Sequence, residues 1–189
     1  MPYLIASKTA PAELTAGLRL VADGEMMSFE QPWSFGAPVI AYVEDAARLD
    51  AIKSRAVAMS GCNAFAVESL EPPGAGQAYV LGGHIMRDME RFKPYAAAVP
   101  EVVKSFGGRF LARGGKVTPL AGHFVPERVV LVEFATAEMA LDFYISDRYA
   151  PLLKIRMATT EARLIIQARS GDLPAVVRTK ATAYLHRQS

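Results

Sequence analysis

The sequence predicts an α+β protein made of two consecutive βαββαβ units. Apolar stretches with the alternation of strands and stretches with helical spacing follow one another in the same order in both halves of the chain. Residues 72–76, rich in proline and glycine, separate the halves as a linker would. Residues 37–70 also match residues 128–167, each with a strand, an acidic residue, an alanine-rich helix and a closing strand. We therefore expect an internal duplication.

The first unit is predicted to occupy residues 1–71. A helix is expected from residue 9 to residue 24, because three apolar residues there share one helical face. A second helix is expected at residues 46–59. Strands are expected at residues 3–7, 25–30, 38–43 and 64–70.

The second unit is predicted to occupy residues 77–169, followed by a C-terminal helical arm at residues 170–189. Residues 107–134 should contain two sheet strands joined by a long polar loop, because apolar alternation and a β-branched run flank a stretch of glycines. The pattern predicts further strands at residues 77–85 and 162–168, and helices at residues 88–106, 136–144 and 146–157.

A βαββαβ unit forms a four-stranded antiparallel sheet with both helices on one face, the ferredoxin-like arrangement. The other face must be buried, and packing two such sheets together buries it. The sheets can come from two chains or from two halves of one chain. We expect an α+β barrel with a central cavity, in a protein that forms a homodimer.

Composition excludes several classes of protein. With 51% hydrophobic and 21% charged residues, the 189-residue chain can bury a sizeable core. Residues 1–76 carry five basic and nine acidic residues, a net of −4, and residues 77–189 carry sixteen and ten, a net of +6. The basic residues are scattered rather than clustered, so we expect no nucleic-acid partner. No apolar run approaches the roughly 20 residues of a membrane span, so we expect no membrane association and a cytoplasmic protein.

The single cysteine, Cys62, excludes a disulfide framework and a cysteine-rich metal site. No histidine lies in its half of the chain to activate it, so a buried structural thiol is expected. The spacing of the three histidines also matches no metal-binding motif. The sequence therefore predicts neither a metal nor a cofactor.

Arg113 is the first candidate for ligand binding. It ends a predicted strand beside Gly114 and Gly115, where a guanidinium and free backbone amides could hold a carboxylate. The alternative is that Arg113 pairs with Glu133 on the neighbouring strand and the glycines only form the turn. Arg128 is expected to be an exposed loop charge.

Two histidines are the next candidates. His123 could act as a general acid or base near neutral pH, or could be an ordinary loop residue. His84 alternates with Val80 and Gly82 at the end of a predicted strand, so it could face the cavity.

Two tyrosines and an arginine lie near a break between two predicted helices. Tyr144 and Tyr149 flank the break, and Arg156 follows within two helical turns. Together they could bind a carboxylated or aromatic molecule in a pocket. Alternatively, the tyrosines pack the helices onto the sheet.

A distinctive set of glycines, charged residues and aromatic residues runs through the second unit. At this spacing, residues 78–168 resemble the family of domains of unknown function numbered 1330 (DUF1330), within the dimeric α+β barrel superfamily. The resemblance implies the fold and a cavity, whereas relatives in the superfamily include cofactor-free monooxygenases, lactone isomerases and haem-handling proteins. The residues that carry it are Gly107 to Gly115, Leu120 to Gly122, Pro126 to Arg128, Val132 to Phe134, Ala140, Tyr144, Ser146, Tyr149 and Arg156.

His123 and Phe124 stand where the family usually has an acid or amide followed by tryptophan. We expect a protein that binds a small carboxylated or aromatic molecule in the barrel cavity. Oxygenase or isomerase chemistry without a cofactor would use Arg113 as the anion anchor and His123 or Tyr144 for proton transfer. The alternative is a non-catalytic structural or stress-related dimer with a packed interior.

Overall fold

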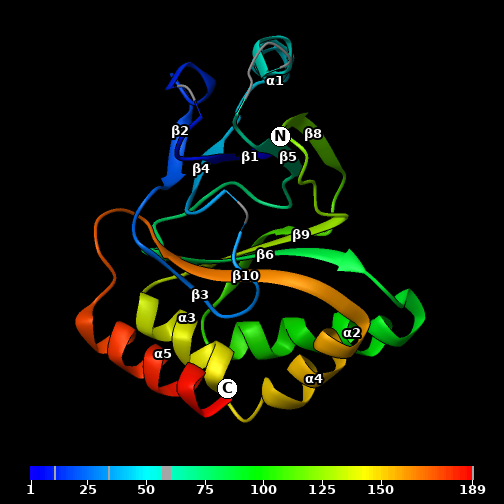
Figure 1. Cartoon of the computed structure of the whole chain (residues 1–189), viewed down its shortest axis with the longest axis vertical. Coiled ribbons are helices and arrows are strands. Elements are labelled where there is room, and N and C mark those ends of the chain that lie inside the picture. The colour runs from blue at the N-terminus through cyan, green and yellow to red at the C-terminus, as the bar shows by residue number, and fades with distance from the viewer. Residues whose placement is uncertain (11, 34, 57–60, 189) are drawn as a thin grey trace.

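The computed structural model describes residues 1–10, 12–33, 35–56 and 61–188, with Ala46 described in its backbone alone. Two five-stranded antiparallel sheets face each other in this part of the chain (Figure 1). The order in the first sheet is β2 (Arg19–Ala22), β4 (Pro38–Tyr42), β1 (Pro2–Ser7), β5 (Ala64–Glu68) and β8 (Val117–Ala121). In the second sheet it is β3 (Met26–Ser28), β10 (Thr160–Ala168), β6 (Ala78–Met86), β9 (Arg128–Phe134) and β7 (Arg109–Arg113).

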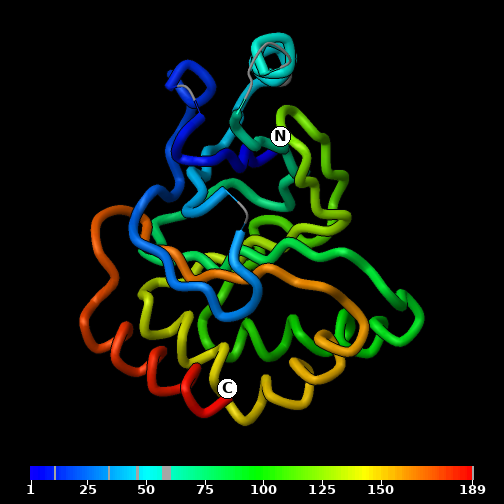
Figure 2. The backbone as a smooth tube through the Cα atoms, in the orientation of Figure 1, coloured from blue at the N-terminus to red at the C-terminus, as the bar shows by residue number. Residues whose placement is uncertain are grey.

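Helices cover the outer face of each sheet (Figures 1 and 2). Above the first sheet lie the 3₁₀ turn η1 (Ala12–Leu14) and the helix α1 (Ala46–Ala56). Below the second sheet lie α2 (Met89–Ser105), α3 (Ala137–Ile145), α4 (Ala150–Thr159) and α5 (Ala175–Gln188). None of the described helices has both the length and the apolar character needed to cross a membrane.

One strand from each half of the chain belongs to the sheet of the other half. β3 of the first half pairs with β10, with Met27 opposite Ile166. β8 of the second half pairs with β5, with Thr118 opposite Ala66. Without these two strands, both sheets have the ferredoxin-like order, in which the first strand of the unit lies between the third and the fourth. The predicted α+β fold with two antiparallel sheets is confirmed, and the sheets face each other within one chain.

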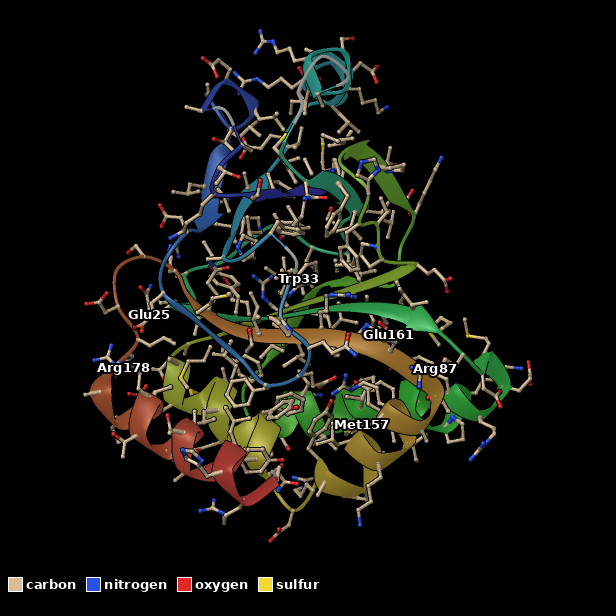
Figure 3. All side chains as sticks on the ribbon, viewed as in Figure 1. Glu25, Trp33, Arg87, Met157, Glu161 and Arg178 are labelled. Carbon is tan, nitrogen blue, oxygen red and sulfur yellow. The ribbon has the colours of Figure 1, made fainter. Side chains whose placement is uncertain are left out.

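The layer between the sheets is packed with aromatic and aliphatic side chains. Tyr3, Trp33, Phe65 and Tyr79 are each at most 3% exposed, and Figure 3 shows Trp33 between the sheets. This packing differs from the expected central cavity, because bulky rings fill the space that smaller side chains would leave open. The cavities described below lie on the helix-covered face of the second sheet.

The prediction of a helix at residues 9–24 is wrong. Among the described residues of this stretch the short turn η1 forms instead, and the chain then turns at Gly17, whose φ is +71°, into β2. The apolar residues Leu14, Leu18 and Val21 suggested a helical face, but residues 19–22 form a strand in which two exposed residues precede the buried Val21 and Ala22, and a register shift interrupts its pairing with β4. Residues 57–59 of the second expected helix lie outside the described residues.

The polar loop expected between β7 and β9 contains a strand, β8. The strand that pairs with it, β5, comes from the other half of the chain, so no local sequence pattern predicts the pairing. Pro119 in β8 is exposed, and β8 lies at the edge of the sheet, where a strand tolerates proline.

Candidate functional site

A small cavity lies between the second sheet and its helices, and we call it the inner cavity. Its volume is about 20 Å³, which is room for about one water molecule. Its lining is mostly apolar, with three polar side chains, and consists of Val80, Gly82, His84, Tyr95, Val99, Val103, Phe110, Val130, Val132, Phe143, Tyr149 and Leu164. An outer cavity of about 10 Å³ shares Tyr95, Val99, Phe110 and Val130 with it and adds Phe92, Ala96, Arg113 and Arg128. The two cavities therefore adjoin.

His84 is the most unusual polar group in this lining. It lies on β6 with 2% of its surface exposed, and neither ring nitrogen makes a well-formed hydrogen bond within the described residues. A Cβ at Gly82 would lie 2.9 Å from Cε1 of His84, so this glycine leaves room for the ring. Burial, followed by the charge of Arg156, lowers the pKa of His84 to about 3. The imidazole is therefore neutral at pH 7, with one lone pair free.

The two tyrosines in the lining of the inner cavity have their hydroxyls close together. The hydroxyl oxygens of Tyr95 on α2 and Tyr149 before α4 lie 3.3 Å apart, and Nε of Arg156 donates to the Tyr149 oxygen at 3.0 Å. Burial, followed by the proximity of Tyr149, raises the pKa of Tyr95 well above its ordinary value. Tyr95 therefore keeps its proton at neutral pH and can donate it.

Arg156 is held by Glu30, which comes from the loop after β3. Nη1 of Arg156 donates to Oε2 of Glu30 at 2.9 Å, Nη2 donates to Oε1, and Tyr144 also donates to Oε1, at 3.0 Å. Burial alone would lower the pKa of Arg156, but Tyr149, Tyr95 and Glu30 raise it. Tyr144, Tyr149 and Arg156 thus converge, and Glu30 joins them from the other half of the chain.

Two arginines lie together at the outer cavity. Arg113 donates from Nη2 to the carbonyl of Ala96 and lies 5.3 Å from the centre of the Phe110 ring. Arg128 lies 5.6 Å from the centre of the Phe92 ring, and its Nε is buried without a hydrogen-bond partner. Burial, followed by the charge of Arg113, lowers the pKa of Arg128. Within the described residues, neither arginine forms an ion pair with a carboxylate.

Gly114 and Gly115 create space for this arrangement. Gly114 has φ +71°, its amide donates to the carbonyl of Val129 at 2.7 Å, and a Cβ would lie 2.3 Å from Cζ of Arg128. A Cβ on Gly115 would lie 2.8 Å from Cβ of Glu68 on β5. The first glycine therefore admits the Arg128 side chain, and the second lets the turn approach the first sheet.

Glu133 and His123 lie apart from the cavities. Glu133 accepts from Arg109 at 2.6 Å and from the amides of Gly74 and Gly76 at 3.0 and 3.2 Å, so it holds residues 74–76 against β9. Glu133 does not pair with Arg113, although such an ion pair was the alternative role considered for Arg113. His123 is exposed in the loop between β8 and β9.

The structure therefore places His84, Tyr149 and Arg113 in the lining of the adjoining cavities, and Arg156 and Tyr144 lie behind Tyr149. Sequence reasoning missed Tyr95, Arg128 and Glu30. Tyr95 shares the helical face of Phe92 and Val99, so its spacing could have revealed it. No local signal marks Glu30, because its partner lies 126 residues away. No three His, Cys, Asp or Glu side chains of the described residues gather as metal ligands would.

Comparisons with known proteins agree with the expected family. Residues 77–169 match the family described as "Domain of unknown function (DUF1330)". The structure of a protein of unknown function from Rhodopseudomonas palustris is 19% identical, with a TM-score of 0.39, over 49% of this chain and 82% of that one. No match was found among curated proteins.

Two further structures align with most of the chain at 10% identity and a TM-score of 0.46. A major regulator of staphylococcal pathogenesis aligns over 88% of this chain and 98% of its own. A candidate monooxygenase from Fusobacterium nucleatum aligns over 89% of this chain and 93% of its own.

Proposed function

We propose that residues 77–169, which form a DUF1330 domain, bind a small organic carboxylate on the helix-covered face of the second sheet. The observation that carries this proposal is the arginine pair. Arg113 and Arg128 lie close enough for the charge of one to lower the pKa of the other, without a carboxylate from the described residues between them. Two partly buried like charges are unfavourable together, and a bound anion would neutralise them.

The organic part of the ligand would enter the cavities behind the arginines. Their lining is mostly valine, phenylalanine and leucine, which suits an apolar or aromatic group. At about 20 and 10 Å³ they are closed to anything larger than water, so a ligand must displace side chains. Arg113 is the simplest to move, because a single carbonyl, that of Ala96, and the face of Phe110 hold it.

Binding can be tested with benzoate and its neutral analogue benzamide in a thermal-shift titration. We expect benzoate to raise the melting temperature and benzamide to raise it less. Arg128→Met should weaken benzoate binding about 10- to 100-fold, the range of a lost hydrogen bond to a charged group. Arg87→Met is the matched control, because Arg87 is exposed and pairs with Glu161 at 3.6 Å (Figure 3). Equal shifts with the two compounds, or equal benzoate binding by Arg128→Met, would contradict the proposal.

A non-catalytic barrel is the second candidate, because the layer between the sheets is filled with rings. In that case the arginine pair would bind no organic carboxylate. The shared strand order of the two sheets, and the exchange of β3 and β8, support a duplicated unit joined by residues 72–76. Homodimer formation stays a prediction, and native mass spectrometry of the freshly purified protein would report both the oligomeric state and any retained ligand.

A further inference from the structure

A proton acceptor and a proton donor both line the small inner cavity. His84 and Tyr95 both line it, and its volume is about 20 Å³. A ligand group that enters so small a space contacts both side chains. Apart from Tyr149, the rest of the lining is apolar, so a hydrogen bond to a ligand that fills the cavity is not weakened by competing water.

Tyr149 and Arg156 favour Tyr95 as a hydrogen-bond donor. The hydroxyls of Tyr95 and Tyr149 lie 3.3 Å apart, and either can donate to the other; when Tyr149 donates, its oxygen accepts from Arg156 while its proton is donated to the oxygen of Tyr95. Tyr95 has no other hydrogen-bond partner within the described residues, so its own proton can point into the cavity. A buried guanidinium thus polarises two hydroxyls in series, and hydrogen bonds in a chain strengthen one another.

His84 is prepared as an acceptor by its surroundings. It is neutral at pH 7 and has an unused lone pair. His84 also lies opposite Arg128 in the pairing of β6 with β9. A carboxylate bound by Arg128 therefore brings the carbon atoms next to it close to the imidazole. Burial and the charge of Arg156 lower the pKa of His84 most, and the same carboxylate would offset the smaller lowering by the charge of Arg128.

We infer that this domain catalyses proton transfer on a 2-oxo carboxylate, with His84 as the base and Tyr95 as the hydrogen-bond donor to the keto oxygen. The inference rests on the proposed function, because Arg113 and Arg128 must bind the carboxylate. His84 takes a proton from the carbon beside the ketone, and the C–H electron pair forms the carbon–carbon double bond. The electron pair of the carbonyl π bond moves to the oxygen, which Tyr95 stabilises. The imidazolium then returns its proton to the oxygen or to the carbon.

This reaction interconverts a ketone and its enol, and nothing is oxidised or reduced. Positioned acid–base groups typically accelerate such steps about 10²- to 10⁴-fold. Arg156 and Tyr149 are positioning residues in this scheme, because they act through Tyr95.

Phenylpyruvate is the probe, because it combines a carboxylate, a ketone, exchangeable C3 protons and a phenyl ring. Loss of the C3 proton signal in D₂O, followed by NMR, measures exchange, and saturation-transfer NMR measures binding in the same sample. We expect the wild type to accelerate exchange about 100-fold or more over buffer. His84→Asn should lose most of this acceleration while still binding phenylpyruvate. Tyr95→Phe, a change that keeps the ring, should reduce it about 10-fold or more.

The matched controls are His186→Asn and Tyr184→Phe on α5, which do not line the cavity and should exchange like the wild type. Binding without accelerated exchange would overturn this inference and leave the proposed function standing. Acceleration that survives both His84→Asn and Tyr95→Phe would also overturn it. Absence of both binding and exchange would overturn the inference and the proposed function together. Tyr95→Phe decides the outcome if His84→Asn does not fold.

Discussion

Arg156 on α4 and Glu30 in the loop after β3 form a buried ion pair that joins the two halves of the chain. Arg156 is 0% exposed, and its Nη1 lies 2.9 Å from Oε2 of Glu30. Tyr144 donates a further hydrogen bond to Glu30, and Tyr149 accepts one from Arg156. Such a pair contributes little net stability while it is complete, because desolvation offsets the attraction of the charges. Removal of one member is costly, since the other charge stays buried without a partner.

Glu30→Ala should therefore lower the free energy of unfolding by about 3–5 kcal/mol, measured by urea denaturation. Glu161→Ala is the control, because Glu161 is partly exposed and its ion pairs are long, 3.6 Å to Arg87 and 4.0 Å to Arg163, so that its loss should cost less than about 1 kcal/mol. The double variant Glu30→Gln with Arg156→Met should recover part of the loss of Glu30→Ala, since it leaves no unpaired charge. Equal losses for Glu30→Ala and Glu161→Ala would show that the pair is not isolated from water.

The lowered pKa of His84 makes the protein sensitive to acid. The unfolded chain takes up the proton with a pKa near 6.5, whereas the folded protein resists it down to about pH 3. The unfolded state binds more protons between these values, so stability falls as the pH falls through this window, by up to about 1.4 kcal/mol per pH unit. His84→Asn should flatten the decline measured by urea denaturation between pH 6.5 and pH 4. An unchanged slope in this variant, with His186→Asn as control, would assign the acid sensitivity to other groups.

The sequence predicted helices and strands well where the residues that define each pattern lie close together in the chain. The helices α2 to α4 and the strands β6, β7 and β9 follow local apolar spacing, and Asp88 and Thr136 cap α2 and α3 through their side chains. Of the two strands that pair across the halves, β3 falls within the strand expected at residues 25–30, whereas β8 lies in the expected loop. The sequence does not predict the partner of either strand, because apolar alternation reports only the local structure.

The same distinction applies to the candidate site. Tyr144, Tyr149 and Arg156 belong to one short segment and were found together, whereas Glu30 lies in the other half of the chain and was missed. Arg128 looked like a loop charge, because only the folded chain shows that Gly114 leaves space for its guanidinium. Spatial neighbours that are distant in sequence, and space created by a missing side chain, are properties of the tertiary structure.

Gly114 offers a direct test of the arginine pair. Gly114→Ala introduces strain at φ +71° and places a Cβ 2.3 Å from Cζ of Arg128, so the guanidinium must move. Gly171→Ala is the matched control, with φ +64° and nothing within 4 Å of its added Cβ. Both should lose about 1 kcal/mol from backbone strain. Gly114→Ala alone should weaken benzoate binding, measured by thermal shift. Equal benzoate binding by the two variants would show that the position of Arg128 does not determine the affinity.

Glu133 should hold residues 74–76, part of the expected linker, in place. It is 6% exposed and accepts from Arg109, from the amides of Gly74 and Gly76, and from the hydroxyl of Tyr79 at 3.3 Å. Glu133→Ala leaves both buried or part-buried amides without an acceptor, at a cost of about 1–3 kcal/mol each. We expect a loss of stability in urea and faster thermolysin cleavage within residues 70–76, where Leu70 and Ala75 are already exposed. Glu101→Ala on the exposed side of α2 should change neither measurement. Cleavage at the wild-type rate in Glu133→Ala would mean that the other contacts of this segment, such as those from Tyr3 to the Glu71 carbonyl and from Arg19 to the Pro73 carbonyl, suffice to hold it in place.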